Sequence, residues 1–357
     1  MKIGIFDPYL DSLSGGEKYM LSIAACLASY HEVFIFWDPQ REAEIKQRAY
    51  KKLGIDISKI RFTPNIFSSD VSLASRFWSS KKYDLIIYLS DGSIPLVWSK
   101  LYIHFQFPVV WVNGNSIKTK IKLKRVGKIF CNSFFTKNYI DKEFNVKSLV
   151  LYPPIIIKEK RENKQDLILH VGRFGMEKEG GNYKKQDVLI EVFKKMVDSG
   201  LGGWQFTLII GVRKEDKDNL EKLKEIAKGY PINIVENPEN QFLWEQYSKA
   251  KIYWHASGFG ENLDKHPEKA EHFGIATVEA MGAGVVPVVI NAGGQKEIVG
   301  DGKNGFLWNK TSELIEKTNV LVQNKKLWEK MSNEAITRSK VFSGDRFCRE
   351  LKALVLP

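Results

Sequence analysis

The 357-residue chain has only three cysteines, Cys26, Cys131 and Cys348, and it lacks the CxxC pairs and Cys/His clusters of zinc sites. The three are far apart, odd in number and set in apolar stretches, so we expect free thiols in a reducing compartment. No apolar run approaches the ~20 residues of a membrane-spanning helix. The chain enters the strand pattern KIGIFDP at residues 2–8 without a signal-peptide pattern. These absences predict a cytoplasmic protein.

Zinc-finger, homeodomain and RNP-type patterns are also absent, which argues against a nucleic-acid partner. The formal net charge of +12 therefore points to anionic small molecules or anionic lipid. A composition of 43% hydrophobic and 27% charged residues is that of a globular protein, and the length predicts two domains.

Short β-rich runs alternate with helical patterns along the whole chain, which predicts parallel α/β layers. The expected strands are 2–8, 32–38, 59–64, 83–89, 102–107, 128–133 and 148–154, then 167–173, 205–212, 232–237, 251–257, 285–291 and 305–308. The expected helices include 17–30, 185–197 and 243–250. A polar stretch, 158–166, follows Pro153 and Pro154 and reads as a linker. Two doubly wound domains would then face each other across a cleft that holds the ligand.

The most informative stretch is EHFGIATVEAMGAGVVPVVINAGGQ, residues 271–295. It reads as a turn, a helix and a buried strand, followed by a Gly-Gly turn. The start of such a helix is an anion site, because its N–H groups are free and its dipole favours negative charge. Glu271 lies in the turn and Glu279 in the helix, which suits a ligand with a central phosphate and hydroxyl-rich ends, such as a nucleotide-sugar. Acidic residues near helix starts are also common as dipole partners.

This phrase, with Glu-His-Phe-Gly-Ile, Val-Glu-Ala-Met, Gly-x-x-Pro-Val-Val and Gly-Gly in order, resembles the donor-binding signature of retaining glycosyltransferases of family 4. The resemblance implies the GT-B fold: a Rossmann-like acceptor domain (1–157), a Rossmann-like nucleotide-sugar domain (158–340) and a last helix (341–357) that packs back on the first domain. It also implies transfer of a hexosyl group from a GDP- or UDP-sugar to a glycan or lipid-linked acceptor, with retention and without a metal or another cofactor.

The resemblance assigns roles to residues of the second half. It implies that Glu279 binds the ribose hydroxyls and Glu271 the transferred sugar, which suits carboxylates as charged acceptors. It further implies contacts from the backbone of Phe273, Gly274 and Ile275 to the sugar and diphosphate. His255 and Ser257 resemble the family residues that lead to this signature. His266 reads as an exposed loop residue.

Two cations would stabilise the charge that develops on the β-phosphate. Arg173 ends the strand at 167–173, and Lys184 matches the family lysine when the helix is aligned on Leu189 and Ile190. Lys185 stays open as the alternative to Lys184. Lys178 reads as a surface charge.

The first half supplies fewer candidates. Gly15 and Gly16, in SLSGGEKY, match the family's glycine-rich loop, which would approach a phosphate; a simple turn is the alternative. His104 is placed near a strand's carboxyl end and, by the resemblance, contacts the transferred sugar; a structural strand histidine is the alternative. Ser133, after Asn132, is either an acceptor-side residue or a helix cap.

Residues 115–128, NSIKTKIKLKRVGK, carry basic side chains and no acidic one. The cations are Lys118, Lys120, Lys122, Lys124, Arg125 and Lys128, and Trp111 lies just before them. A basic segment flanked by aromatics is attracted to anionic lipid. The alternatives are peripheral contact at the inner face of the cell membrane and a solvated surface.

Other functions of a similar fold remain open. A non-catalytic nucleotide-sugar-binding protein or a nucleotide-sugar epimerase would share the architecture. A phosphorylase would need a pyridoxal lysine and a longer chain, and a dinucleotide oxidoreductase would need GxGxxG after the first strand, which SLSGGEKY lacks. The one D-x-D, Asp216 to Asp218, lies among lysines and reads as a solvated helix start rather than a Mg²⁺ site.

Overall fold

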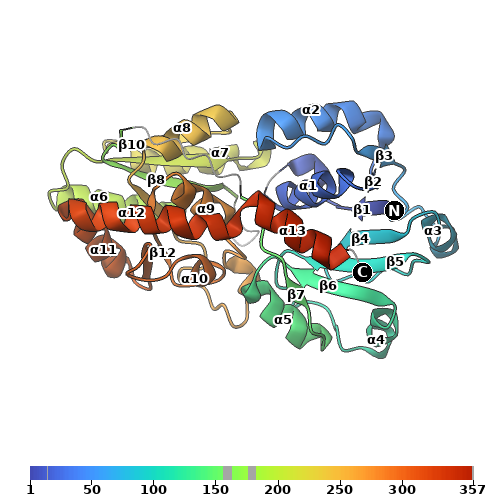
Figure 1. The fold of residues 1–357 in the computed structure, drawn as a ribbon. Coiled ribbons are helices and arrows are strands. Elements are labelled where there is room, and N and C mark those ends of the chain that lie inside the picture. The colour runs from blue at the N-terminus through green and yellow to red at the C-terminus, as the bar shows by residue number, and fades with distance from the viewer. Residues whose placement is uncertain (14, 156–162, 176–181, 356–357) are drawn as a thin grey trace. The chain divides into compact units, whose positions relative to one another are not determined.

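The computed structural model describes residues 1–13, 15–155, 163–175 and 182–355 (Figure 1). The chain divides into two compact units. Unit 1 comprises Met1–Pro154 with Gly344–Pro357, and unit 2 comprises Ile155–Ser343. The linker predicted at 158–166 and the predicted boundary at 157/158 fall mostly outside the described residues.

Unit 1 is built on a seven-stranded sheet, as far as its residues are described, with order β3-β2-β1-β4-β5-β6-β7 and parallel pairing throughout. Its strands are β1 (Lys2–Phe6), β2 (Glu32–Phe36), β3 (Arg61–Thr63), β4 (Leu85–Leu89), β5 (Lys100–Phe105), β6 (Val126–Cys131) and β7 (Leu149–Val150). Central strands such as β4 are buried along their whole length, which explains their continuous apolar sequence. The strand order reverses between β1 and β4, so this unit is doubly wound.

The helices of unit 1 are α1 (Gly15–Ala28), α2 (Glu42–Leu53), α3 (Leu73–Ser80), α4 (Ile117–Leu123), α5 (Phe134–Phe144) and α13 (Gly344–Val355), with short 3₁₀ turns η1 (Leu10–Ser12) and η2 (Pro39–Arg41). One apolar core lies where α1 packs on β1 and β2, with Ile3, Ile23 and Leu27 among its members. A second core includes Ile86, Ile103 and aromatic residues such as Phe105.

The last helix, α13, packs against α1 in unit 1. Phe347 meets Tyr19 edge to face at 5.5 Å, and Leu351 is completely buried. A disulfide joins Cys26 of α1 to Cys348 of α13, whose Cα atoms are 5.8 Å apart. The expectation of free thiols is therefore wrong for this pair and holds for buried Cys131. The two half-cystines are 322 positions apart in sequence, so only the packing of the two helices reveals their contact.

Unit 2 contains, in its described part, a six-stranded parallel sheet of order β10-β9-β8-β11-β12-β13. Its strands are β8 (Leu167–Arg173), β9 (Gln205–Gly211), β10 (Ile232–Glu236), β11 (Ile252–His255), β12 (Val286–Ile290) and β13 (Phe306–Trp308). The strand order reverses between β8 and β11. In an open sheet of this kind, ligands bind beyond the carboxyl ends of the strands at that point.

The helices of unit 2 are α6 (Gln186–Asp198), α7 (Lys217–Ala227), α8 (Asn240–Lys249), α9 (Ile275–Gly282), α10 (Gln295–Ile298), α11 (Thr311–Gln323) and α12 (Lys325–Ser339), with 3₁₀ turns η3 (Lys214–Asp216), η4 (Pro267–Lys269) and η5 (Lys340–Phe342). Apolar residues of α6, including Leu189 and Phe193, pack in a core with Phe206 and Trp254 of the sheet. The predicted fold class of two doubly wound α/β domains is confirmed. Among the described residues, no helix is both long and apolar enough to span a bilayer.

We expect Leu351→Ala to lower the free energy of unfolding by about 2–4 kcal/mol, because it leaves a cavity in the core that α13 shares with α1. Urea denaturation measures the loss. Arg349→Ala, at an exposed position of the same helix, is the control and should stay close to the wild type. Equal midpoints for the two variants would show that α13 does not contribute to the core.

Candidate active site

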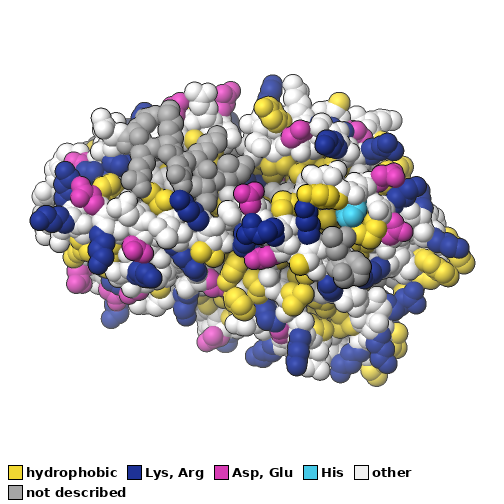
Figure 2. All heavy atoms as spheres, in the orientation of Figure 1, with side chains coloured by type: hydrophobic (Ala, Val, Ile, Leu, Met, Phe, Trp, Pro, Cys, Tyr) yellow, Lys and Arg dark blue, Asp and Glu magenta, His cyan; other side chains and the backbone are white. Residues whose placement is uncertain are grey.

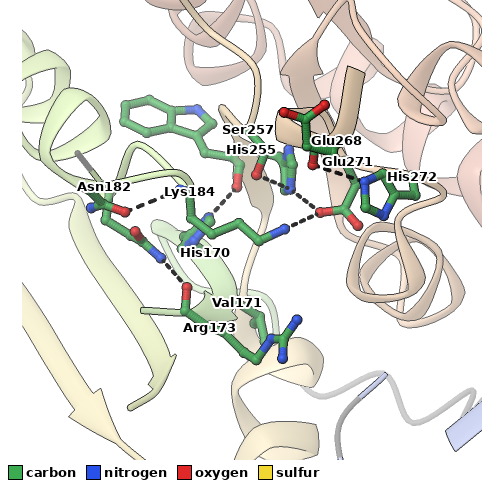
Figure 3. Close-up of polar contacts among 12 residues, drawn as sticks. His170, Val171, Arg173, Asn182, Lys184, His255, Ser257, Glu268, Glu271 and His272 are labelled. Atoms are coloured by element: carbon green, nitrogen blue, oxygen red, sulfur yellow. Dashed lines mark hydrogen bonds and ion pairs between the residues drawn. The ribbon is translucent and has the colours of Figure 1, made fainter. Parts of the chain in front are cut away.

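The site in unit 2 begins at the carboxyl ends of β8 and β11, which pair in parallel. Arg173 is the last residue of β8 and is exposed, and His255 is the last residue of β11 and is buried. Figure 3 draws the guanidinium of Arg173 without a contact to the other residues shown. Among the described residues its side chain makes no ion pair, whereas its carbonyl oxygen accepts a hydrogen bond from Gln186 Nε2 at 3.0 Å. An exposed cation at this edge is free to meet an anionic ligand.

Lys184, Glu271 and His255 form one cluster at this edge (Figure 3). Lys184 Nζ lies 2.7 Å from Glu271 Oε2, and His255 Nε2 lies 2.9 Å from the same oxygen. Both members of the ion pair are mostly shielded, with side chains 15% and 22% exposed. The loop before α6, the end of β11 and the loop before α9 are thus joined through a single carboxylate.

The electrostatics of the cluster keep Glu271 charged. Burial opposes ionisation, but the charge of Lys184 and the hydrogen bond from His255 together hold the pKa of the Glu271 carboxyl well below its usual 4.5. Burial lowers the pKa of His255, against the partial compensation from Glu271. The imidazole is therefore neutral at pH 7 and donates its Nε2–H to the carboxylate.

The choice between Lys184 and Lys185 is settled as far as Glu271 is concerned. Lys185 is the N-cap of α6 with φ of 57°, and its Nζ lies 2.5 Å from Glu261 Oε1. Lys269 approaches the other oxygen of Glu261 at 3.1 Å. Lys185 thus fastens the loop that contains Glu261, while Lys184 reaches Glu271. Lys178, read as a surface charge, lies outside the described residues.

The amino end of α9 follows Glu271 directly. Gly274 is its N-cap with φ of 119°, a conformation that favours glycine. Gly294 packs beneath, where an added Cβ would lie 2.4 Å from Phe273 Cα, and its N–H donates to Glu271 O at 2.7 Å. The Gly-Gly turn therefore needs glycine, because the backbone of the loop before α9 packs directly against it. The N–H groups of the first turn of α9 have no acceptor within the helix, as at any helix start.

Within α9, Glu279 is almost fully buried and accepts a hydrogen bond from the Tyr247 hydroxyl at 3.3 Å. Burial, with the negative charge of Glu279 adding to it, raises the pKa of Tyr247 well above 10, so the phenol stays a donor. Phe273 is buried and meets Phe342 at 5.4 Å, so only its backbone is available to a ligand.

Three buried polar residues near the cluster escaped prediction: His170, Gln186 and Gln295. His170 Nδ1 lies 2.9 Å from Trp254 O, and burial lowers the pKa of this histidine to about 3. Within the described residues, His170 Nε2 and both amide atoms of Gln295 lack a hydrogen-bond partner. Gln295 Nε2 lies 3.0 Å from where a Cβ on Gly274 would be, at the start of α9. Residue type alone does not mark such positions, because His170 lies in an apolar run, Gln295 follows a glycine pair and Gln186 lies among charged residues at a helix start.

The glycine-rich loop of unit 1 differs from the expected phosphate site. A Cβ on Gly16 would lie 2.5 Å from Gln106 Oε1, and Gln106 Nε2 donates to Gly16 O at 3.0 Å, so the side chain of Gln106 occupies the space beside this glycine. The first turn of α1 also contains buried Glu17, which accepts from Ser12 Oγ at 2.6 Å. Burial, and then Glu17, raise the pKa of Asp7 to about 8. With carboxyl groups already at this helix start, we no longer assign Gly15 and Gly16 to the diphosphate.

His104 and Ser133 have structural contacts in the same unit, although His104 Nε2 lacks a hydrogen-bond partner among the described residues. His104 is completely buried, stacked between Tyr19 at 4.3 Å and Phe130 at 4.5 Å, with Nδ1 3.1 Å from Phe130 O. The strand face that holds it is covered by α1, so it does not project from the sheet edge as expected. Ser133 is the N-cap of α5 and accepts from the Thr136 N–H at 3.0 Å, which is the capping alternative.

Of the remaining candidates, Ser257 contacts the cluster, and no contact with the cluster is seen among the described residues for Asp216, Asp218 or His266. Asp216 and Asp218 stand at the start of α7, and His266 is exposed, with Nδ1 3.2 Å from Glu268 Oε1. Ser257 Oγ lies 3.4 Å from His255 Nε2 and so adjoins the cluster, as the resemblance led us to expect. No group of three or more His, Cys, Asp or Glu residues arranged to hold a metal occurs among the described residues.

Comparison with known proteins gives the family. Residues 153–338, more than half of the chain, match the model of the family "Glycosyl transferases group 1". The chain therefore belongs to this family. The predicted resemblance to GT-B glycosyltransferases is confirmed at this level, while the roles of the two glutamates stay predictions.

Similar proteins extend the match over both units. The chain is 26% identical over 84% of its length to a GDP-Man:Man(3)GlcNAc(2)-PP-Dol alpha-1,2-mannosyltransferase of Dictyostelium discoideum, of which it spans 56%. It is 24% identical to the alpha-1,3/1,6-mannosyltransferase ALG2 of the same organism, with 87% of each chain covered. Anabaena HepE in complex with UDP shares the fold, with a TM-score of 0.74, 16% identity and 99% coverage of both chains.

We expect the stabilisation from the Lys184–Glu271 pair to depend on pH in a defined direction. The folded-state pKa of Glu271 lies below the unfolded value of about 4.5, so its contribution is complete above pH 4.5 and is lost as pH falls through the folded value. Glu271→Gln should lower the free energy of unfolding by roughly 1–3 kcal/mol at pH 7. Melting curves from pH 7 to pH 3 should show this gap closing below pH 4.5. A gap independent of pH would mean that Glu271 is not ionised in the fold.

Proposed function

We propose that this protein transfers a hexosyl group, with retention, from a GDP- or UDP-linked sugar to a glycan or lipid-linked acceptor. The observation that supports it most is the cluster at the carboxyl edge of β8 and β11. There, Arg173, which makes no ion pair with the described residues, the Lys184–Glu271 pair and the amino end of α9 lie at the switch point of the sheet.

The diphosphate would bind at the amino end of α9. Breaking the sugar–phosphate bond leaves negative charge on the β-phosphate, and preorganised positive groups there stabilise the transition state. The first-turn N–H groups after Gly274 and the exposed guanidinium of Arg173 supply such groups. Buried Gln295, with its amide unpartnered beside Gly274, leaves hydrogen-bonding capacity at the same place. The N–H groups of α9 are fixed by the helix, and the exposed guanidinium of Arg173 would turn toward the phosphate.

Lys184 has two partners available in this scheme. In the structure it neutralises Glu271, and a bound diphosphate would compete for the same ammonium group. Release of Lys184 would free Glu271 to accept hydrogen bonds from sugar hydroxyls, while His255 keeps the carboxylate oriented. Glu279, held by Tyr247, would accept from the ribose. We propose that these protein cations serve in place of a metal ion.

The acceptor side of the proposal rests on unit 1 and on the relatives. The Dictyostelium discoideum alpha-1,2-mannosyltransferase is named for a PP-Dol-linked glycan acceptor. In this chain, residues 115–128 carry the basic segment that would attract an anionic membrane in which such an acceptor resides. We propose that the leaving phosphate takes the proton of the acceptor hydroxyl on the same face of the sugar. That path gives retention without a separate base.

Replacing the charged groups that are proposed to bind the donor should reduce turnover. We expect Arg173→Ala, Lys184→Ala and Glu279→Ala each to cut the rate of nucleoside-diphosphate release by at least ~10²-fold, the scale of one preorganised charge contact. Lys185→Ala is the matched control, because its side chain pairs with Glu261 instead. If Lys185→Ala lost activity while Lys184→Ala kept it, the phosphate contact would have to be reassigned. Addition of a chelator should leave the wild-type rate unchanged.

Nucleoside diphosphates alone should stabilise the fold. A ligand at 100 times its Kd adds about 2.7 kcal/mol to the unfolding free energy, so millimolar GDP or UDP should raise the melting temperature. The comparison of GDP with UDP would identify the base of the donor. The matching nucleosides, which lack the diphosphate, should give little shift. A melting temperature that none of the nucleotides changes would contradict the donor assignment.

A further inference from the structure

Unit 1 exposes a group of large apolar side chains outside any core. Trp78 of α3 is 61% exposed and Trp98 is 48% exposed, and their rings stack at 5.6 Å with an interplanar angle of 22°. Phe77 touches both tryptophans, at 5.8 Å and 5.3 Å. In α3 only Ser80 is buried, Phe77 is half-buried, and Leu73 and Trp78 are exposed to the solvent. Exposed aromatic patches of this kind mark interaction surfaces.

The topology brings a second helix to the same edge of the sheet. α3 leads into β4, Trp98 precedes β5, and α4 leads into β6. These three strands are parallel neighbours, so their amino ends lie side by side. Contacts join the segments there: Trp98 N donates to Ser80 Oγ at 2.9 Å, and Arg125, just after α4, lies 5.7 Å over the Phe77 ring.

α4 has the composition of an interfacial helix. It begins after Ser116, whose Oγ accepts from the Thr119 N–H at 3.2 Å, and none of its residues is buried. Ile117 is 78% exposed and Ile121 is 61% exposed, one helical turn apart. Lysines separate them, so an apolar stripe runs between cations. A helix with this pattern lies in the plane of a membrane interface rather than across it.

The charge around the aromatic group is positive. Lys81 Nζ lies 5.2 Å over the Trp98 ring, and α4 and its flanks add the cations of the basic segment. Nearby carboxylates accept hydrogen bonds within the unit: Asp84 from the Lys2 N–H at 2.6 Å, Asp70 from Ser68, and Glu143 from the Gly114 N–H at 2.9 Å, and they are fewer than the cations. Figure 2 shows hydrophobic and basic side chains intermixed over this end of unit 1. The partner that complements such a surface is anionic.

We propose that Trp78 and Trp98, with Ile117, Ile121 and the lysines of α4, form a surface that anchors this protein to an anionic lipid bilayer. Tryptophan favours the interface because its ring is apolar and its N–H reaches the headgroups. The lysines add attraction to acidic lipid, and their apolar stems follow the isoleucines into the headgroup layer. Aromatic insertion and charge together distinguish this surface from a merely solvated basic face.

The anchor surface lies at the amino ends of the strands of unit 1, and ligands of doubly wound sheets bind at the carboxyl ends. It is therefore an attachment surface rather than an acceptor subsite. Such an anchor serves the proposed function, on which this role rests, because an enzyme held at the bilayer meets a lipid-linked acceptor at high local concentration.

Sedimentation with vesicles tests the anchor. The full-length wild type should bind vesicles of phosphatidylglycerol and phosphatidylcholine and should bind pure phosphatidylcholine at least about tenfold more weakly. Trp78→Ser with Trp98→Ser should weaken binding to the acidic vesicles by at least about tenfold through loss of the inserted rings. Lys118→Gln with Lys120→Gln and Lys122→Gln should weaken it by about tenfold to a hundredfold.

Matched controls separate the surface from general effects. Tyr50→Ser removes another exposed aromatic of unit 1, and Lys325→Gln with Lys326→Gln and Lys330→Gln removes the same charge from α12. Both controls should bind acidic vesicles like the wild type. All variants should keep the wild-type melting temperature, since the replaced side chains lie outside the cores. Equal binding by the tryptophan variant and the Tyr50 control would overturn the anchor.

Two further results discriminate between explanations. A concentration-dependent dimer in light scattering, abolished by the tryptophan variant, would overturn the lipid anchor in favour of a contact between copies. The nucleoside-diphosphate melting shift, measured on the same proteins, separates the two proposals. Vesicle binding without that shift would contradict the proposed function alone, and the shift without vesicle binding would overturn the anchor alone.

Discussion

The ion pair between Lys184 and Glu271 is the constraint around which the candidate site is arranged. It connects the loop that enters α6 with the turn that enters α9, and His255 at the end of β11 fixes the shared oxygen. Because the pair is largely shielded from water, loss of either charge would leave its partner poorly solvated. The pair therefore holds the two loops of the candidate site together. In the proposed function, an anionic donor would take the place of Glu271 beside Lys184.

The fold could be predicted to a large extent, because it depends on features that are local in sequence. Buried parallel strands are continuous apolar runs, and β4 and β12 are examples that the pattern located directly. The contact of Cys26 with Cys348 could not be predicted, since it depends on how α13 packs across α1. The exposure of Trp78 and Trp98 could not be predicted either, because residue type does not show which apolar side chains the fold leaves uncovered.

The candidate site also has features that the sequence predicts and features that it does not. The positions of Arg173, Lys184 and Glu271 could be anticipated because a strand end and a helix start fix where those side chains lie, while their roles stay predictions. The complete burial of His104 could not be anticipated, because strand alternation gives the face of a side chain and not what covers that face. Lys184 and Lys185 are adjacent but have different partners, and the φ of 57° at Lys185 is a backbone conformation that the sequence did not reveal. Asp7 and Glu17 place buried carboxyl groups beside the glycine loop before α1. Their burial could not be predicted from the spacing of residues in the sequence.

The central claim is that the amino end of α9 and the end of β8 hold a diphosphate. Hydrogen–deuterium exchange with and without GDP or UDP tests it most directly, because a bound phosphate would protect the N–H groups that it contacts. The account predicts slower exchange in peptides that cover residues 272–280 and 170–175, with little change at the start of α1. Protection at the start of α1 instead, or unchanged exchange at the start of α9 under saturating nucleotide, would contradict it.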